Sequence, residues 1–598
     1  MTNTADHRTI YGLSLFRHLD DAAKAGVATH FERLAVERGQ VLIEEGGPPG
    51  SMFVVLSGRF SVTRNGHDNP IGEIGSGEQI GEIGFLTGST RTATVTALRD
   101  SIVFELNHER LEALAESDPR IWRAMCADLA SRLAAANVAH PRTSQLVPRT
   151  IALIAAGNST LDKGFIGSLT AAFAARAPTL VIDSSRLDLV RSNGADFDDS
   201  KMTERLNALE TDYTYVLMIA DASLTPWTQK ILHHADLVLA AGNYAADPKL
   251  NEIEALAARL IAPAAIRLIL VHEVRRNLSA TGRWLGSRSV TMHHHVARRE
   301  PEDFARLVRF VEGTARGLVL SGGGALCVAH VGVYKALLEA NYNFDIMGGT
   351  SGGSAMAAAF LLQKRPGEIE RDVHAMFVKK RAMHRYTLPL YSLLDHTHFD
   401  LELRGLFGES DIEDLWLPFF AVSTNLSRYG LHIHRSGSLW KALRASASIP
   451  VMLPPIYTEE GEMLVDGGLV DNVPVRTMHQ LKAGPNVVVA LDTGDLDRFN
   501  VVYEELPSRG DLLRIAINPW SRKDLPKAPS LANVLMRSLM ANRHAFRHHL
   551  KQNDLLLVPP IPVGASFLDW HRHGELLDAS YRWADACLKD QRLADGFR

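Results

Sequence analysis

The sequence predicts a multidomain protein with three folded parts: an N-terminal β-barrel with flanking helices, a middle α/β domain with a parallel sheet, and a C-terminal α/β domain. At 598 residues, the chain is too long for one hydrophobic core. Short strands with glycine turns fill the first part, and strands alternate with helices in the second. Glycine-rich turns between strands and helices mark the third part. We place these domains at residues 10–136, 150–313 and 314–598, with a linker at 137–149.

The composition is that of an ordinary globular protein, with 46% hydrophobic and 22% charged residues. A net charge of -4 and the lack of a concentrated Lys/Arg block give no reason to expect a nucleic-acid partner. The three cysteines lie far apart, without the spacing of a disulfide framework or a zinc site. This usage fits a reducing compartment.

The N-terminus lacks the apolar stretch of a signal peptide, and no uncharged apolar run is long enough to cross a bilayer. We therefore expect a cytoplasmic protein. Any membrane contact would be peripheral, at the inner face of the membrane.

In the first domain, strands are predicted at 40–43, 51–56 and 60–63, followed by a helix at 119–133. The helix could pair with its twin in a homodimer or pack on the barrel, and the sequence does not decide between these. The chemically informative stretch is Gly81-Glu82 with Arg91-Thr92 after it. A helical turn after Gly81 would aim backbone N–H groups at an anion, and Arg91 could bind its phosphate.

This segment resembles the phosphate-binding cassette of cyclic nucleotide-binding domains. The resemblance implies that Gly81 opens the cassette, that Glu82 contacts the ribose and that Arg91 contacts the cyclic phosphate. It also implies cyclic AMP or cyclic GMP as an allosteric ligand, with Thr92 as a weak indication of guanine. The alternative is a degenerate barrel that keeps Glu82 and Arg91 as a structural pair.

In the middle domain, strands are predicted at 151–156, 180–183, 215–220, 237–240 and 266–271, with helices between them. The first turn, at 157–164, lies where a phosphate loop would, but it lacks Gly-Lys-Ser/Thr. We therefore interpret the domain as a degenerate P-loop or Rossmann-type domain with a structural or regulatory role, rather than a nucleotidase. The run His293-His294-His295 is interpreted as packing or surface, because three successive strand residues cannot face one metal ion.

The third domain contains Gly349-Thr350-Ser351-Gly352-Gly353, a Gly-x-Ser-x-Gly motif. An apolar strand leads into the motif and an alanine-rich helix follows it, so Ser351 falls on the turn between them. That context is typical of a nucleophile elbow. The alternative is a Gly/Ser-rich loop that packs a helix against a sheet.

Two further segments favour the nucleophile. The first is Gly322-Gly323-Gly324, between a strand at 317–320 and a helix at 325–340, where backbone donors could form an oxyanion hole. The second is Asp466, at the end of a strand and before a glycine pair, where its carboxylate could be presented across a cleft.

Together these segments resemble the patatin-like phospholipases, specifically the bacterial members related to neuropathy target esterase. The resemblance includes residues 415–420, 425–427 and 444–450. It implies that Ser351 is the nucleophile, that Asp466 is its partner in a dyad and that the three glycines form the oxyanion loop. The implied substrate is a lipid ester, a lysophospholipid or phospholipid, and no cofactor is implied for catalysis. Apolar residues at 357–362 and 376–378 could line an acyl site.

The sequence departs from the family after the glycine loop. The family pattern continues with a small residue, then Arg or Lys, then Gly, whereas this chain has Ala325-Leu326-Cys327. The alternative function is therefore a weakly active or inactive cyclic-nucleotide sensor or interaction protein.

A Ser-His-Asp triad is the competing mechanism. It would require a later histidine such as His479, His544 or His571, none of which has a distinctive setting. His330, close to the glycine loop, is interpreted as a helix residue that packs on the sheet. We expect the tail, residues 496–598, to complete the hydrolase domain.

Overall fold

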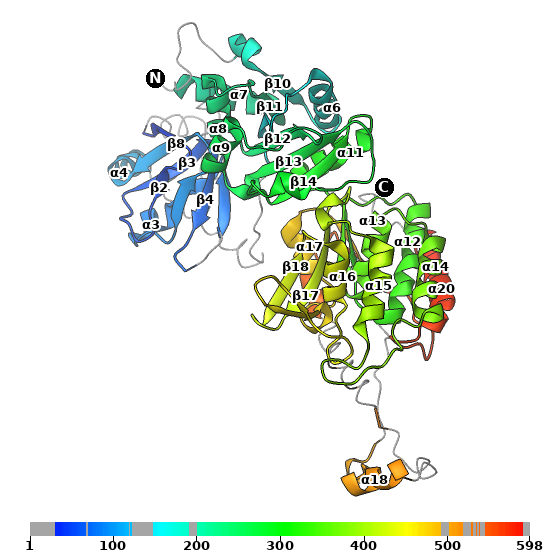
Figure 1. Ribbon diagram of the computed structural model, residues 1–598. Helices are drawn as coiled ribbons and strands as arrows, with labels where there is room; N and C mark the ends of the chain where they lie inside the picture. The colour runs from blue at the N-terminus through cyan, green and yellow to red at the C-terminus, as the bar shows by residue number, and fades with distance from the viewer. Residues whose placement is uncertain are drawn as a thin grey trace. The chain divides into compact units, whose positions relative to one another are not determined.

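The computed structural model describes residues 30–66, 70–118, 120–121, 147–189, 200–491, 501–517, 528–529, 534, 538 and 545–589. The chain divides into two compact units. Unit 1 contains residues 1–275 and 283–312, and unit 2 contains residues 276–282 and 313–598. Figure 1 shows the elements of each unit. Within the described residues, no helix is long and apolar enough to cross a membrane.

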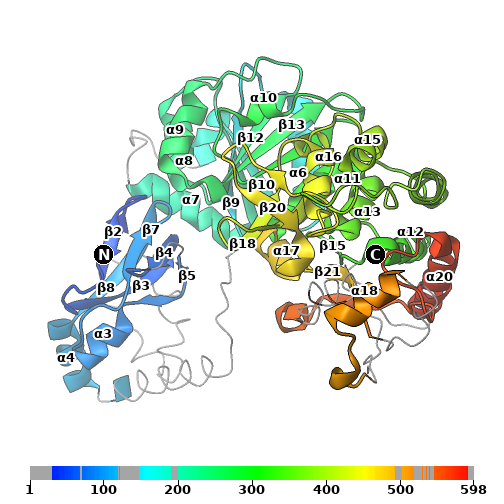
Figure 2. The ribbon, with the colours of Figure 1, turned by 60° about the horizontal axis from the view of Figure 1, so that its bottom comes forward.

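Unit 1 begins with an antiparallel barrel made of two four-stranded sheets, in the orders β1-β8-β3-β6 and β2-β7-β4-β5 (Figure 2). The strands are β1 (Glu32–Val36), β2 (Val41–Ile43), β3 (Ser51–Ser57), β4 (Arg59–Thr63), β5 (Gly72–Gly75), β6 (Gln79–Ile80), β7 (Thr94–Ala97) and β8 (Ser101–Asn107). Among the described residues, α3 (Glu82–Thr87) and α4 (His108–Ser117) accompany them. The three strands predicted here are confirmed, whereas most of the predicted helix at 119–133 lies outside the described residues.

The second part of unit 1 is a six-stranded parallel sheet in the order β10-β11-β9-β12-β13-β14. Its strands are β9 (Thr150–Ala155), β10 (Thr179–Ile182), β11 (Tyr215–Ile219), β12 (Leu237–Asn243), β13 (Ile266–His272) and β14 (Met292–Ala297). The helices include α6 (Lys163–Ala174), α7 (Ser200–Asp212), α8 (Pro226–His234), α9 (Glu252–Leu260), α10 (Gly282–Leu285) and α11 (Pro301–Glu312). The predicted parallel α/β domain is confirmed.

The edge strand β14 was not predicted. Its three histidines are polar, so the segment lacks the apolar run of a buried strand, although it is buried along most of its length. His294 and His295 are buried, and His295 contacts His272 through their ring nitrogens at 3.0 Å. The described residues contain no cluster of His, Cys, Asp and Glu that could hold a metal ion. The burial of His294 and His295 confirms the interpretation as packing for these two residues.

The first turn of this sheet is filled by the protein itself. The backbone N–H of Gly157 donates to Glu254 Oε2 at 2.8 Å, and Glu254 forms a buried ion pair with Arg288 at 2.7 Å. The ring of Trp284 is fully buried, and a Cβ added at Gly157 would lie only 2.9 Å from its carbon atoms. A carboxylate and an indole thus occupy the space in which a phosphate loop would hold its anion.

The barrel and the parallel sheet share a buried charge network within unit 1. Arg99, in the turn between β7 and β8, donates to both carboxylate oxygens of Glu210 at 2.6 and 2.9 Å. Its Nε lies 3.2 Å from Asp236, and Lys230 pairs with Asp100 at 2.8 Å. Breaking a buried pair of this kind leaves an uncompensated charge, so the network holds the two domains together.

Unit 2 is built on a mixed sheet in the order β19-β20-β17-β16-β15-β21-β22, with β18 paired to β17. The strands are β15 (Gly317–Leu320), β16 (Ile346–Thr350), β17 (Phe419–Asn425), β18 (Gly430–His434), β19 (Ile456–Tyr457), β20 (Met463–Asp466), β21 (Asn486–Val489) and β22 (Leu555–Leu557). Four of them, β17, β16, β15 and β21, run parallel at the centre. Their carboxyl ends therefore converge at one edge, where ligand sites of such sheets form.

Helices cover this sheet, among them α12 (Ala329–Glu339), α13 (Gly352–Leu361), α14 (Pro366–Val373), α15 (His396–Phe407), α16 (Leu439–Ser446), α17 (Val475–Leu481) and α20 (His573–Lys589). Helices α12, α14 and α20 lie side by side (Figure 1). Because β22 and α20 come from the tail, the tail does complete this domain. The helix predicted from residue 325 begins instead as a 3-10 turn, η4 (Gly324–Val328), since Leu326 bonds back to Gly323.

Candidate active site

Ser351 lies on a strained turn between β16 and α13, as the motif predicts. Its φ of 52° and ψ of -130° fall in a region that non-glycine residues rarely adopt. A Cβ on Gly349 would lie 2.6 Å from the carbonyl of Leu320, and one on Gly353 would lie 2.3 Å from that of Ser321. Both motif glycines are therefore required by the close approach of β15 and the loop after it.

Neighbouring serines hold this strained turn. The Ser351 N–H donates to Ser446 Oγ at 2.8 Å, and the Ser446 hydroxyl donates to the carbonyl of Val422 at 2.6 Å. The Ser354 hydroxyl donates back to the Ser351 carbonyl at 2.6 Å. Sequence reasoning assigned no role to Ser446 or Ser354, because a buried serine has no recognisable pattern until the fold brings it to the turn.

Asp466 faces Ser351 from the end of β20. The Ser351 hydroxyl donates to Asp466 Oδ2 at 2.7 Å, and the Gly468 N–H donates to Oδ1 at 2.8 Å. Both oxygens of the carboxylate are thus engaged, and its orientation is fixed. The two residues are 115 positions apart in the sequence.

Burial raises the pKa of Asp466 to about 6, opposed by its hydrogen bonds with Ser351 and Gly468. The side chain is 5% exposed, so desolvation of the charged form is the dominant effect. A carboxylate with this pKa is a stronger base than an ordinary aspartate, yet it remains mostly ionised at neutral pH.

The glycine loop lies beside the serine, and its amides have different partners. The Gly322 N–H donates to the carbonyl of Asn472 at 3.0 Å, and the Ala325 N–H donates to that of Phe567 at 2.7 Å. In the described part of the chain, the N–H groups of Gly323 and Gly324 meet no protein acceptor. Of the three predicted glycines, Gly322 therefore serves close packing, since a Cβ there would lie 3.2 Å from the Cβ of Ser351.

Asn472 connects the glycine loop with the loop that carries the aspartate. Besides accepting from Gly322, it donates through Nδ2 to the Gly322 carbonyl at 3.4 Å. The Thr350 hydroxyl donates to the carbonyl of the adjacent Asp471 at 2.8 Å. The segment after Asp466 thus fixes both the glycine loop and the residue before the nucleophile. Its sequence, Asp-Asn-Val-Pro, gave no indication of that role.

The departure from the family pattern lies behind the loop. Leu326 and Cys327 are buried in η4. The Cys327 sulfur would lie 2.8 Å from a Cβ on Gly352, so it packs against the elbow. Burial, followed by the charge of Asp466, raises the pKa of Cys327 far above its ordinary value. Cys327 is therefore a packing residue rather than a thiolate nucleophile.

Of the histidines considered from the sequence, His330 and His479 have other partners, and His571 is exposed in η11 (Trp570–Arg572). His330 lies in α12 and bonds through Nε2 to the Ser321 carbonyl at 2.8 Å, and burial lowers its pKa to about 4. His479 pairs with Asp554 at 2.8 Å, and His544 lies outside the described residues. Within the described residues, the hydrogen-bond partner of the Ser351 hydroxyl is the Asp466 carboxylate, which is the contact that a dyad requires.

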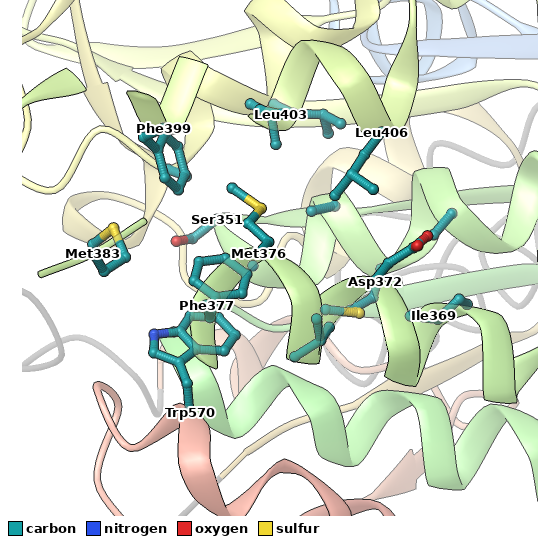
Figure 3. Close-up of a pocket in the computed structure, with 18 of the residues that line it drawn as sticks. Ser351, Ile369, Asp372, Met376, Phe377, Met383, Phe399, Leu403, Leu406 and Trp570 are labelled. Atoms are coloured by element: carbon teal, nitrogen blue, oxygen red, sulfur yellow. The ribbon is translucent and has the colours of Figure 1, made fainter. Parts of the chain in front are cut away.

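An apolar pocket opens at Ser351 and encloses about 890 Å³, part of it open to solvent. Figure 3 shows Ser351 between Met383 and Phe399 on one side and Asp372 and Ile369 on the other. Met376, Phe377, Leu403, Leu406 and Trp570 also line it. Among the described lining residues, only Lys364 and Asp372 are charged, and they pair with each other at 2.7 Å.

The second candidate site is the cassette on the barrel. Gly81 has a φ of 79° and caps α3, while Thr92 is exposed. The Arg91 guanidinium donates to the carbonyls of Gly81 (2.7 Å) and Ser51, and burial lowers its pKa, opposed by the charge of Glu82. Arg91 is thus held by the cassette's own backbone.

Comparison with known families matches three parts of the chain. Residues 33–118 match the cyclic nucleotide-binding domain, and residues 148–315 match the neuropathy target esterase family P-loop like domain. Residues 318–479, which contain Ser351 and Asp466, match the patatin-like phospholipase family. In these three domains and in their order along the chain, the protein is similar to patatin-like phospholipases of the neuropathy target esterase type.

Two relatives are similar to this chain over nearly all of its length. The patatin-like phospholipase domain-containing protein 6 of Homo sapiens is 29% identical over 92% of the chain and 44% of its own length. The lysophospholipase nte1 of Neosartorya fischeri is 29% identical over 93% of the chain and 42% of its own length. The chain therefore spans less than half the length of these relatives.

Proposed function

We propose that the chain is a serine esterase that hydrolyses carboxylic esters of lipids, with lysophospholipids or phospholipids as substrates. The observation that carries the proposal is the hydrogen bond from Ser351 to Asp466 at the opening of an apolar pocket. The patatin match and the relative named as a lysophospholipase support this substrate class.

In the proposed reaction, Ser351 Oγ attacks the ester carbonyl while Asp466 accepts its proton. The amides of Gly323 and Gly324 donate to the oxyanion of the tetrahedral intermediate. The alcohol then leaves with the proton from Asp466, and the acyl group stays on Ser351. Water next attacks the acyl-enzyme, gives its proton to Asp466 and releases the fatty acid, with the proton returning to Ser351. No cofactor takes part in these steps.

The pocket suits one acyl chain. Its walls are apolar and run along α13, where Ala355 and Ala359 leave room beside the helix that begins after Ser351. Ten residues of helix span about 15 Å at 1.5 Å per residue, enough for a long acyl chain. Burial of that chain would hold the ester carbonyl at Ser351.

The proposal is tested by measuring fatty-acid release from lysophosphatidylcholine. Wild-type chain should release fatty acid, and Ser351→Ala should not, because the nucleophile is gone. Ser436→Ala is the matched control, since it alters an exposed serine of the same unit that lies outside the site. Equal release by wild type and Ser351→Ala would refute the assignment.

We further propose that a cyclic nucleotide binds the barrel and regulates the esterase. A cyclic phosphate at the start of α3 would replace the carbonyls of Gly81 and Ser51 as the partners of Arg91, and Glu82 would accept from the ribose. Such a ligand regulates only if it binds two states of the protein with different affinity.

Calorimetry with cyclic AMP and with cyclic GMP tests this second proposal. We expect heat of binding from at least one nucleotide, and we expect Glu82→Gln and Arg91→Lys to weaken that binding. Thermal unfolding of each variant controls for damage to the barrel. If neither nucleotide gives heat of binding, the barrel does not bind a cyclic nucleotide and serves only as a scaffold.

A further inference from the structure

The loop after the π-helical turn η5 (His374–Lys379) exposes an unusual amount of apolar surface. Tyr386, Leu388, Leu390 and Tyr391 are 75%, 79%, 81% and 87% exposed. These four large side chains lie within six residues of each other in the sequence, at the tip of the loop, whereas exposed hydrophobic residues are ordinarily scattered singly. We call residues 384–391 the apolar loop.

The apolar loop is anchored firmly at both ends. Ala382 and Met383 are buried before it, and Leu394 is buried after it. The Thr387 N–H donates to the Leu393 carbonyl at 3.0 Å, and the Leu393 N–H donates to the carbonyl of Val451, which is itself 57% exposed. The tip is therefore presented on a fixed base rather than on a free segment.

The segment that carries the tip is basic, and Asp395, which follows it, interacts electrostatically with Arg385. Residues 379–391 contain Lys379, Lys380, Arg381 and Arg385 but no Asp or Glu. Lys380 pairs with Glu402 on α15, while Lys379, Arg381 and Arg385 are exposed. Apolar side chains flanked by cations and tyrosines are typical of segments that insert into the interface of an anionic bilayer.

The apolar loop also leads directly to the proposed active site. Met383, the last buried residue before it, lines the pocket on one side of Ser351 (Figure 3). Met383 therefore joins the tip, along the chain, to the pocket that is proposed to receive the lipid. This continuity selects a lipid surface over a protein as the occupant.

We propose that the apolar loop docks this chain on an anionic lipid bilayer, with Leu388 and Leu390 inserted among the lipids and Arg381 and Arg385 on the headgroups. The inference rests on the proposed function in one respect, namely that the pocket beside the loop receives lipid esters. Docking itself is a binding event and does not require turnover.

Sedimentation of the full chain with vesicles tests the proposal. Vesicles of phosphatidylcholine with phosphatidylglycerol should carry the protein into the pellet, and added salt should weaken that binding. Leu388→Asp/Leu390→Asp should lower the affinity by about tenfold or more per leucine, because each buried leucine is lost. The matched control is Tyr429→Asp/Val563→Asp, which alters two side chains that are 90% and 97% exposed elsewhere on unit 2.

The cations are tested separately with Arg381→Gln/Arg385→Gln. This variant should lose about fivefold in affinity per cation for the anionic vesicles and little for pure phosphatidylcholine. The proposal is overturned if wild type stays in the supernatant, if the leucine and control variants bind alike, or if the leucine variant abolishes a dimer instead of vesicle binding.

Repeating the sedimentation with Ser351→Ala separates this inference from the proposed function. If the wild type binds vesicles but releases no fatty acid, the esterase proposal is refuted and the docking proposal is retained. Fatty-acid release without vesicle binding would refute the docking loop and leave the esterase.

Discussion

The parallel sheet of unit 1 and the mixed sheet of unit 2 each have a glycine turn after a central strand, and the two turns are used in opposite ways. At Gly157 the amide donates to the Glu254 carboxylate, and Trp284 fills the space beside it. At Gly323 and Gly324 the amides have no acceptor among the described residues, and the pocket opens at the adjacent Ser351. A glycine turn therefore indicates an anion site only where the protein leaves its donors free.

The largest effect should come from disturbing the filled turn. Glu254→Gln leaves the buried Arg288 guanidinium without its counter-charge, so we expect a loss of about 3–5 kcal/mol in the free energy of unfolding. Glu252→Gln, on the exposed face of the same helix, should change it by less than about 0.5 kcal/mol. Denaturant titration measures both, and a stability of Glu254→Gln equal to that of wild type would show that the turn does not depend on this carboxylate.

Disturbing the open turn should instead reduce turnover. Gly324 has a φ of 56°, and a Cβ there would lie 2.3 Å from the Phe567 carbonyl, so Gly324→Ala must displace the loop. We expect a loss of about 10²- to 10³-fold in kcat, the usual effect of losing one oxyanion donor. Gly405→Ala, where a Cβ meets nothing within 4 Å, is the control. A kcat unchanged by Gly324→Ala would exclude this loop from catalysis.

The pH dependence of kcat/KM should report the ionisation of Asp466. The base must be ionised, so kcat/KM should fall below its pKa of about 6, by roughly tenfold per pH unit. Because this pKa is raised on folding, the ionised carboxylate destabilises the fold as pH rises from about 4 to about 6. Asp466→Asn should therefore be inactive but no less stable than wild type at pH 8. A kcat/KM that does not change between pH 5 and pH 8 would argue against Asp466 as the base.

The smallest effect should come from restoring the family pattern. Leu326→Arg/Cys327→Gly changes residues behind the loop, while the amides of Gly323 and Gly324 stay in place. We expect a change of less than about tenfold in kcat, since no donor is removed. A much larger gain would mean that the natural loop is impaired, and would favour a sensor over an esterase.

The sequence predicted the features that local chemistry enforces. Gly349 and Gly353 indicate the nucleophile elbow, because no side chain fits at these positions against the neighbouring backbone. The strands are predicted from their runs of apolar residues. Ser446, Asn472 and Glu254 could not be found, since each acts through a partner far away in the sequence. Strand β14 was not predicted, because its three histidines do not look like a buried strand. The filling of the Gly157 turn by Trp284 could not be predicted either, because it depends on packing between residues that no sequence motif contains.

The central claim, that Ser351 is an activated nucleophile in an open turn, is tested most directly by labelling the full chain with a fluorophosphonate probe. We predict covalent labelling of the wild type at Ser351, loss of the label in Ser351→Ala and strong slowing in Asp466→Asn. Labelling that is absent from the wild type, or that persists in Ser351→Ala, would contradict the account.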